Sequence, residues 1–574
     1  MHASSSSAPA DATPPEPLFR GRRPAELRFG TSGLRGLVAD ITDLEVYLNT
    51  RGFLDYIRQT GDPAIEQPVS VAADLRPSSD GPDRSIVRAV LAAIAEAGLE
   101  SEFLGQIPTP ALTLHGLRRR RLSIMVTGSH IPFDRNGIKF NKADGEVLKA
   151  DEPGILSAVQ AVREALYREP AGESRFADDG RFRQPPPPAA RTGEQTAVEE
   201  YEARYREFLG SDALGGLRVV FYQHSAVGRD IMVRLLRRLG AEVWPMGRSE
   251  SFVPIDTEAL SAETLAALQV MVDEAVEAHG PIDAVVSTDG DSDRPLVAGV
   301  TAEGRVEFLP GDRLGMLVAA RLGVDAVAVP VSANDGLDVW ARQTGVTLRK
   351  TRIGSPHVIE AMAALAAAGS ARVAGWEANG GFLTGSVLLR EGRRLEPLPT
   401  RDAALPMLAA LAAIRESGRP LTSLVDELPQ RFGCAGLLDN FPPATSRRLL
   451  ERFSPPDSRL VDVTFTDAGV AFEATGAAAS IEGGMQTALQ EIRRSMGDLF
   501  AGVPGLGEVR RLNYLDGIRV TFVSGEVVHI RPSGNAPQLR CYTVADSPAR
   551  ADQLLRLALA EPAGILRRIE AALG

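Results

Sequence analysis

Apolar runs alternate with amphipathic stretches along most of the chain, and this alternation predicts repeated strand–helix units. In the first block, residues 69–76 (VSVAADLR) predict a strand, and residues 85–99 (SIVRAVLAAIAEAGL) predict a helix with a glycine suited to its C-cap. A second strand is predicted at 122–127 (LSIMVT). Strands that alternate with helices in this way favour an α/β fold with a mostly parallel sheet.

Two further blocks repeat the pattern, and the last block departs from it. A helix at 198–210 and a strand at 217–222 open the second block. The third begins near residues 308–323 and contains an apolar strand at 326–331. From about residue 428 the pattern changes. Residues 517–534 alternate in β fashion around a Ser-Gly turn, 538–545 predict another strand, and 548–573 predict a closing helix. These features indicate an α+β layout with antiparallel strands.

The pattern and the composition of the connecting segments divide the chain into four domains. A Ser-, Pro- and Ala-rich N-terminus predicts a disordered tail, and the run Pro185–Pro188 predicts an extended linker. The expected division is a tail at 1–24, domains at 25–168, 197–306, 307–427 and 428–574, and the linker at 169–196.

Composition narrows the class of protein. The chain has 574 residues, 44% of them apolar, and a formal net charge of −11, which predicts a globular protein without a nucleic-acid or anionic-membrane partner. Its two cysteines cannot build a disulfide framework, and no secretory signal or apolar span is visible, so we expect a cytoplasmic protein. None of its four lysines follows a glycine, which excludes the standard nucleotide-binding P-loop.

The most informative stretch is STDGDSDRP, which carries Asp289, Asp291 and Asp293 at alternate positions. In an extended loop, alternate side chains leave on the same side, so the three carboxylates can converge on one hard cation, for which Mg²⁺ is the usual choice. An EF-hand is excluded because position twelve of such a loop is Val300 rather than glutamate. Arg294 is a natural anion partner beside a metal. On spacing alone, a solvated acidic turn remains the alternative.

Two other loops suit phosphate and sugar. HIRPSGNAPQLRCY offers backbone N–H groups around Ser533, Gly534 and Asn535 between Arg531 and Arg540, an arrangement that can hold a phosphate, although a plain β-turn is as consistent with it. In GWEANGGF, Glu377 and Asn379 can offer a carboxylate and an amide to sugar hydroxyls, although Asn-Gly is also a common turn signal.

The stretch VTGSHIPFDRNGIKF contains an adjacent Ser129 and His130. In an extended chain these side chains point to opposite sides, which is poor geometry for a nucleophile–base pair, and there is no G-x-S-x-G elbow. Lys139 follows shortly, and its amine can act as an acid or base where arginine cannot, unless it is only a surface lysine. RFGTSGLRG, which ends near Arg35, indicates no more than an anion-binding loop.

Together these five loops, in this order, resemble the α-D-phosphohexomutase superfamily, the phosphoglucomutases and phosphomannomutases. The resemblance covers the chain from about Arg28. It implies three mixed α/β domains and a C-terminal domain similar to the TATA-box-binding-protein fold, arranged around a central cleft. It further implies an enzyme that interconverts hexose 1-phosphate and hexose 6-phosphate through a phosphoserine and a hexose 1,6-bisphosphate, acting as a monomer or homodimer. Phosphomannomutase is the expected activity, with phosphoglucomutase or phosphoglucosamine mutase as alternatives, and a phosphatase or an inactive sugar-phosphate-binding regulatory paralogue as rivals.

The resemblance also implies roles for individual residues. Ser129 would carry the phosphoryl group and share an Mg²⁺ ion with the three aspartates, while Arg35, His130, Lys139 and Arg294 would line the reaction centre. Glu377 and Asn379 would meet the sugar 3- and 4-hydroxyls, and the phosphate that is not reacting would contact Arg531, Ser533, Gly534, Asn535 and Arg540. The chain departs from the usual pattern at Ile131, Ser292, Asn379, Gly381 and the Gly-Asn-Ala-Pro sequence of the last loop. These departures leave the preferred sugar open.

Overall fold

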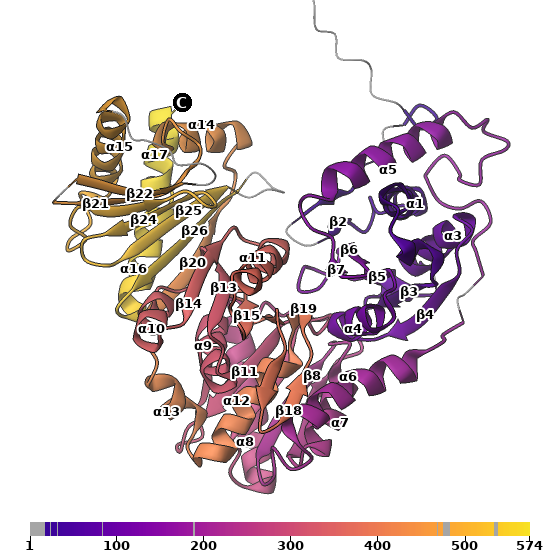
Figure 1. Ribbon diagram of the computed structural model, residues 1–574, viewed down its shortest axis with the longest axis horizontal. Coiled ribbons are helices and arrows are strands. Elements are labelled where there is room, and N and C mark those ends of the chain that lie inside the picture. The colour runs from indigo at the N-terminus through magenta and orange to yellow at the C-terminus, as the bar shows by residue number, and fades with distance from the viewer. Residues whose placement is uncertain are drawn as a thin grey trace, which may run out of the picture.

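The computed structural model describes residues 18–22, 25–30, 33–82, 84–187, 190–467, 469–474, 483–532 and 538–573. The chain forms an arc of domains, with the N-terminal domain at one end and the C-terminal domain at the other (Figure 1). The predicted architecture of three mixed α/β domains and a final domain with an antiparallel sheet is confirmed.

The first domain is built on a sheet in the order β1-β2-β6-β5-β3-β4, with β7 paired to β6. Its first long helix is capped at the N-terminus by Thr42, whose hydroxyl accepts a hydrogen bond from the Glu45 amide, and at the C-terminus by Gly61 in the left-handed conformation. The strands are β1 (Arg28–Phe29), β2 (Leu34–Leu37), β3 (Val69–Ala73), β4 (Ser101–Gln106), β5 (Ser123–Val126), β6 (Arg135–Lys142) and β7 (Gly145–Glu146). The helices are α1 (Asp43–Thr60), η1 (Pro63–Glu66), α2 (Pro77–Asp80), α3 (Ile86–Glu96), α4 (Thr109–Arg119) and α5 (Glu152–Tyr167).

The second domain has the sheet β12-β11-β10-β8-β9, and the third has β14-β13-β15-β16-β19. The second domain contains α6 (Glu194–Leu209), β8 (Arg218–His224), α7 (Arg229–Arg238), β9 (Glu242–Arg248), α8 (Ala262–His279), β10 (Ala284–Thr288), β11 (Pro295–Val300) and β12 (Val306–Phe308). The third contains α9 (Gly311–Leu322), β13 (Ala326–Pro330), α10 (Gly336–Thr344), β14 (Thr347–Thr351), α11 (Ser355–Ala367), β15 (Val373–Trp376), β16 (Phe382–Thr384), β17 (Leu388–Arg390), β18 (Arg393–Leu395), β19 (Leu398–Asp402), α12 (Ala404–Ser417) and α13 (Leu421–Asp426).

The three α/β domains share one strand order. Each has three parallel neighbours followed by an antiparallel strand: β4-β3-β5-β6, β9-β8-β10-β11 and β14-β13-β15-β16. The hairpin that joins the last two strands of each set carries the serine loop, the aspartate loop or the glutamate loop. Corresponding loops of three structurally equivalent domains therefore supply the candidate chemistry.

The fourth domain has one sheet in the order β20-β26-β25-β24-β23-β21-β22, and all its pairings are antiparallel. The helix predicted over 548–573 is two helices, because the segment Ala560–Gly564, which contains Pro562, separates them. The elements are β20 (Phe432–Leu438), α14 (Pro443–Phe453), β21 (Leu460–Thr466), β22 (Gly469–Ala474), α15 (Gly483–Phe500), β23 (Val509–Asn513), β24 (Ile518–Phe522), β25 (Val527–Pro532), β26 (Leu539–Ala545), α16 (Pro548–Leu559) and α17 (Ile565–Leu573).

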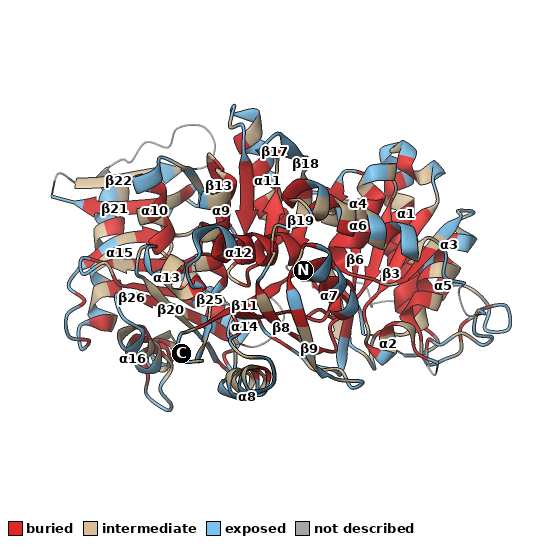
Figure 2. Ribbon diagram, turned by 90° about the horizontal axis from the view of Figure 1, so that it is seen from below, coloured by how far each residue is buried: buried red, intermediate tan, exposed pale blue. Residues whose placement is uncertain are grey.

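Buried side chains join the first three domains, whereas the fourth has a core of its own. One apolar cluster runs from the first-domain helix α4 through both middle domains, and a separate cluster lies within the fourth domain. Inner strands of the α/β domains, such as β3 and β13, are buried, and many helices show exposed faces (Figure 2). Polar contacts link the fourth domain to the third: Arg519 pairs with Asp335, and Asp516 accepts a hydrogen bond from the Ile353 amide at 3.0 Å. Polar contacts of this kind thus join the fourth domain to the third.

The segments expected to be a tail and a linker contain packed residues. Phe19 is buried in the core of the first domain, against the ring of Tyr167. Within 169–196, Phe176 is buried and stacks on Phe182, and α6 begins at Glu194. Apolar burial thus holds parts of both segments, which their composition alone did not reveal.

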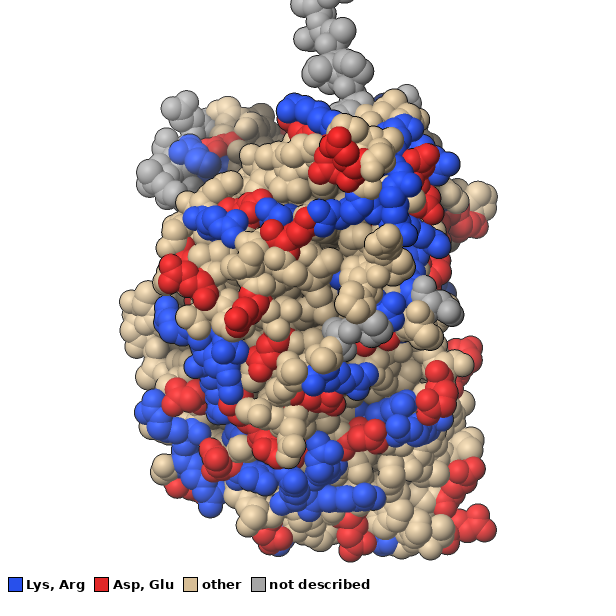
Figure 3. Space-filling view, turned by 90° about the vertical axis from the view of Figure 1, so that its right-hand side faces the viewer, with Lys and Arg blue, Asp and Glu red and all other residues tan. Residues whose placement is uncertain are grey.

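The surface agrees with the low overall charge. The face shown in Figure 3, on the side of the first domain, carries basic and acidic side chains interspersed rather than one large patch of a single charge. Among the described residues, no helix is long and apolar enough to span a bilayer.

Candidate active site

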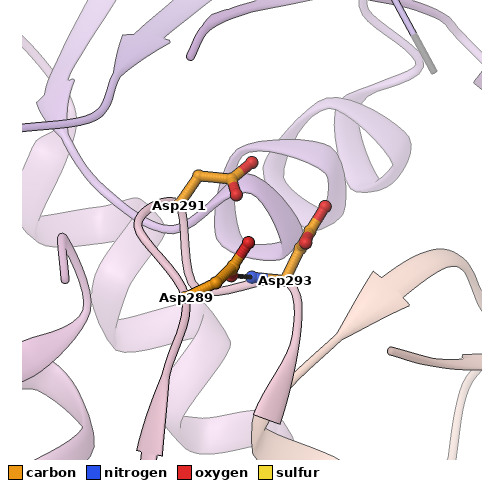
Figure 4. A group of neighbouring side chains, drawn as sticks. All are labelled: Asp289, Asp291 and Asp293. Atoms are coloured by element: carbon orange, nitrogen blue, oxygen red, sulfur yellow. Dashed lines mark hydrogen bonds between the residues drawn. The ribbon is translucent and has the colours of Figure 1, made fainter. Parts of the chain in front are cut away.

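The predicted metal loop follows β10 and brings its three aspartates together. Asp289, Asp291 and Asp293 are almost fully buried, and one oxygen from each lies within 4.8 Å of the others. Figure 4 shows the three carboxylates rising from one loop, with the Asp293 amide donating to Asp289 at 3.2 Å. The predicted convergence is confirmed, although the loop is a turn with Ser292 in the left-handed conformation rather than the extended stretch from which the convergence was expected.

The charges around this cluster are unevenly balanced, because Lys139 lowers the pKa of Asp291, and Arg401 and Lys139 lower that of Asp293, whereas Asp289 lacks such a close cation among the described residues. Burial and repulsion from Asp291 and Asp293 raise the pKa of Asp289 well above its usual range. One oxygen of Asp291 and one of Asp293 are buried without a hydrogen-bond partner. Unpaired buried carboxylate oxygens in a cluster of this kind fit a divalent cation with oxygen ligands. The residues present therefore fit a metal ion.

Ser292 adopts the left-handed conformation with φ 57° at the position where glycine is common in this loop. Its hydroxyl accepts a hydrogen bond from the Gly228 amide at 3.0 Å and bonds the Thr288 hydroxyl at 2.8 Å. These two contacts offset the strain of a non-glycine residue in that conformation. The departure at Ser292 thus preserves the shape of the loop.

The serine loop of the first domain faces the aspartates. The Ser129 hydroxyl donates to Asp289 at 2.6 Å, and the Lys139 ammonium donates to Asp291 and Asp293 at 2.6 and 2.7 Å. Burial alone would lower the pKa of Lys139, but the two carboxylates outweigh it and raise that pKa. Lys139 is therefore a buried ammonium rather than a surface lysine.

The geometry expected for Ser129 and His130 is wrong in one respect. Ser129 has φ 54° instead of an extended conformation, so its hydroxyl lies 3.5 Å from the His130 Nδ1 rather than on the opposite side. Burial and the charges of Arg294 and Arg35 lower the pKa of His130, which keeps its imidazole neutral. The hydroxyl is nevertheless closer to Asp289 than to this ring.

Arg76, which no sequence motif marked, binds the backbone of the serine loop. Its guanidinium donates to the carbonyls of Ser129, Ile131, Pro132 and Arg135 at 2.5–3.0 Å. A carboxylate of the same strand end, Asp74, pairs with it and also accepts from the Thr127 hydroxyl and the Gly128 amide. The backbone of Ile131 makes this contact, so the loop does not need an amide side chain at that position for it. Asp74 and Arg76 both belong to the sequence DLR, which ends the strand predicted at 69–76. This pair of opposite charges directly after an apolar strand was the signal that could have identified them.

In the glutamate loop, Glu377 and Asn379 lie beside each other and are both buried. Arg401 of β19 was also not marked by any motif. It donates to Glu377 at 2.6 Å and to Asp293 at 2.9 Å, so it connects the glutamate loop to the aspartate loop. A side chain at Gly381 would place its Cβ 2.7–2.9 Å from Arg401. Glycine at 381 therefore makes room for this arginine.

The candidate loops surround a cavity of about 550 Å³ to which all four domains contribute. The lining includes seven cationic side chains and three carboxylates: Arg35, Lys149, Arg294, Arg352, Arg401, Arg531 and Arg540, with Glu258, Glu377 and Asp516. Burial and the nearby charges of Arg294 and Arg401 lower the pKa of Arg35 to about 10. Crowded cations of this kind favour an anionic ligand such as a phosphate.

From the fourth domain, Arg531 and Arg540 both line this cavity and face each other across paired strands. Arg531 donates to Asp516 at 2.9 Å. The predicted phosphate-holding residues Ser533, Gly534 and Asn535 lie outside the described residues.

Comparisons with known proteins agree with this arrangement. Four family models described as phosphoglucomutase/phosphomannomutase match in order: domain I at residues 26–165, domain II at 199–301, domain III at 310–432 and the C-terminal domain at 485–559. A phosphomannomutase from Sinorhizobium fredii is 38% identical over 93% of this chain and 98% of its own length. One from Salmonella muenchen is 35% identical over 93% and 95%.

More distant proteins share the fold. A phosphoglucosamine mutase from Thermobifida fusca is 30% identical over 76% of this chain and 89% of its own. The crystal structure of parafusin, a phosphoglucomutase from Paramecium, superposes with a TM-score of 0.60 at 14% identity, covering 96% of this chain and 97% of the other. A fold of three equivalent α/β domains and an antiparallel fourth, closed around one cationic cavity, defines the α-D-phosphohexomutases. The chain belongs to the phosphoglucomutase/phosphomannomutase family of that superfamily.

Proposed function

We propose that this protein is a phosphohexomutase that interconverts hexose 1-phosphate and hexose 6-phosphate, with mannose phosphates as its main substrates. The observation that carries the proposal is the Ser129 hydroxyl, which lies 2.6 Å from Asp289 at the edge of a buried carboxylate cluster and beside a cationic cavity. The two relatives that align over 93% of this chain are named phosphomannomutases, which supports mannose over glucose or glucosamine.

In the proposed reaction, the bond between phosphorus and the Ser129 oxygen breaks while phosphorus bonds to a sugar hydroxyl oxygen, which yields hexose 1,6-bisphosphate. The bisphosphate reorients, and its other phosphoryl group returns to Ser129. Lys139 is the proposed acid and base for the sugar hydroxyl. As a neutral amine it would take the proton of the attacking hydroxyl in the first transfer, which requires its release from Asp291 and Asp293, whose contacts hold the proton on it in the resting arrangement. It would return that proton to the sugar oxygen as the phosphoryl group goes back to Ser129.

A magnesium ion is the proposed cofactor, held by Asp289, Asp291, Asp293 and an oxygen of phosphorylated Ser129. When bound, it would supply positive charge that offsets the charge of the transferring phosphoryl group. Arg35, His130 and Arg294 are proposed to contact that group from the cavity side, where two cations and a neutral imidazole can all donate hydrogen bonds to its oxygens.

Substrate contacts are proposed at the other two walls of the cavity. Glu377 and Asn379 would bind the sugar 3- and 4-hydroxyls. Arg531 and Arg540, with Ser533, Gly534 and Asn535, would bind the phosphate that is not reacting. Because either end of the sugar must present a phosphate to this wall, arginine forks and backbone N–H groups suit it better than a shape-specific pocket.

The test is a substrate panel with glucose 1,6-bisphosphate as activator. We expect conversion of mannose 1-phosphate to mannose 6-phosphate at a higher kcat/KM than for the glucose and N-acetylglucosamine phosphates, together with phosphoserine at position 129 by intact-protein and peptide mass measurement. Release of inorganic phosphate without any isomerisation would instead establish a phosphatase. Binding of the sugar phosphates with neither reaction would establish the regulatory paralogue.

A further inference from the structure

One carboxylate in the cavity wall is not used by the proposed mechanism. Glu258 lies in the segment of the second domain between β9 and α8, and it lines the cavity together with Glu377 and Asn379. No motif of the sequence marks it as a site residue. Its place in the cavity follows from the packing of the segment around it.

Three contacts fix that segment. The ring of Phe252 stacks on the Arg76 guanidinium of the first domain, with 3.8 Å between the guanidinium carbon and the ring centre. Ile255 is buried in the core of the second domain. The Thr257 hydroxyl, itself buried, donates to the Asn379 carbonyl of the sugar loop at 2.7 Å. Glu258 therefore follows directly on a residue bonded to the sugar loop.

The three carboxylates of the cavity differ in their partners. Glu377 is paired with Arg401 at 2.6 Å, and Asp516 with Arg531 at 2.9 Å. Among the residues that the structure describes, the Glu258 carboxylate has no hydrogen bond and no ion pair; only its backbone amide is bonded, to Asp256 at 3.0 Å. Burial and the neighbouring Asp256 raise the pKa of Glu258 to about 7. Glu258 is half-buried and lines the cavity, so a hydroxyl of a bound ligand can donate a hydrogen bond to its carboxylate.

One hydroxyl of the bound sugar remains as a hydrogen-bond donor to Glu258. A hexopyranose that carries or exchanges phosphoryl groups at C1 and C6 has three other hydroxyls, at C2, C3 and C4. Under the proposed function, Glu377 and Asn379 take those at C3 and C4. We infer that Glu258 accepts a hydrogen bond from the C2 hydroxyl in one of the two orientations that the sugar adopts, and thereby determines which sugar the enzyme prefers. Mannose and glucose phosphates differ only in the configuration at C2, so this contact bears on the discrimination that the sequence left open.

The inference rests on the proposed function, and the experiment separates the two. Three 1-phosphates are compared: mannose, glucose and 2-deoxyglucose, the last of which lacks the C2 hydroxyl. Wild type, Glu258→Ala, Glu258→Gln and the control Glu274→Gln, an exposed glutamate on α8 of the same domain, are assayed for kcat/KM and, by calorimetry, for binding. Thermal melting checks that each variant is folded.

We expect Glu258→Ala to lower kcat/KM and affinity for the better C2-hydroxyl substrate by about 10- to 100-fold, as the loss of a hydrogen bond to a charged acceptor does. For the 2-deoxy sugar the change should stay below about threefold, since the missing donor removes the same contact. Glu258→Gln keeps an acceptor oxygen and should recover part of the loss, and Glu274→Gln should match wild type.

Two results would overturn the inference. Equal losses on all three sugars would show that Glu258 acts on the reacting groups or on folding rather than on C2. Unchanged kinetics and binding on all three would show that it makes no sugar contact. A wild type that isomerises none of the sugars would refute the proposed function instead, and the binding comparison would then still decide the C2 contact.

Discussion

Arg76 donates hydrogen bonds to the backbone of the serine loop, and its replacement tests whether these bonds position Ser129. Replacing Arg76 by lysine keeps the positive charge opposite Asp74, whose side chain is fully buried, but removes the guanidinium fork. Arg76 donates hydrogen bonds to four backbone carbonyls, including that of Ser129 at 3.0 Å, and its guanidinium stacks on the ring of Phe252. A lysine has one nitrogen in place of two donating ones, so it cannot serve all four carbonyls.

The magnitude follows from the carbonyls left without a donor. If lysine satisfies two of the four, two buried acceptors lose a partner at about 1–1.5 kcal/mol each, or about 2–3 kcal/mol in total. If this free energy is lost from the loop conformation that holds Ser129 in its left-handed geometry, the population of the competent loop falls by about 30- to 150-fold. We therefore expect kcat to fall within that range while KM changes little, because Arg76 does not line the cavity.

The assay is initial-rate mutase kinetics with saturating activator, accompanied by thermal melting and by measurement of phosphoserine occupancy. Arg118→Lys, at an exposed position on α4 of the same domain, is the matched control and should behave as wild type. A folded Arg76→Lys enzyme with wild-type kcat would refute the view that this fork positions Ser129. A rise in KM with unchanged kcat would place the effect in substrate binding and refute it equally.

Three further outcomes are expected. Ser129→Ala should lose about 10⁶-fold in kcat, as removal of a covalent nucleophile does, and should show no phosphoserine by mass measurement; a full rate would contradict the phosphoserine mechanism. Chelation should abolish activity and added Mg²⁺ should restore it, whereas Asp291→Asn should lower the rate by about 10²- to 10³-fold and shift the Mg²⁺ requirement upward; a chelator-resistant enzyme would exclude the metal. Gly381→Ala forces Arg401 from its partners at a cost of about 1–3 kcal/mol, so kcat/KM should fall by about 5- to 150-fold with a lower melting temperature; wild-type kinetics would show that Arg401 can give way.

Much of the fold was predictable because its signals are local. Apolar runs and amphipathic stretches predict β3, α3, β5, α6, β8 and β13 from periodicity, and turn residues mark the loops between them. The aspartate triplet was predictable as a cluster because its members lie within five residues of one loop, although the turn that brings them together depends on Ser292 and its contact with Gly228. The division of residues 548–573 into two helices was harder to predict, because periodicity indicates one helix there and Pro562 lies between α16 and α17.

The rest depended on contacts between residues far apart in the chain. Sequence determined which loops carry a serine, three aspartates and a glutamate, because each motif is complete within a few residues. Only the tertiary structure decided that Ser129 turns to within 3.5 Å of His130, that Arg76 and Arg401 brace the loops, and that Glu258 stands unpaired in the cavity. Backbone strain at a single residue and pairings across domains arise when equivalent hairpins are packed around one cavity, and neither leaves a periodic trace in the sequence.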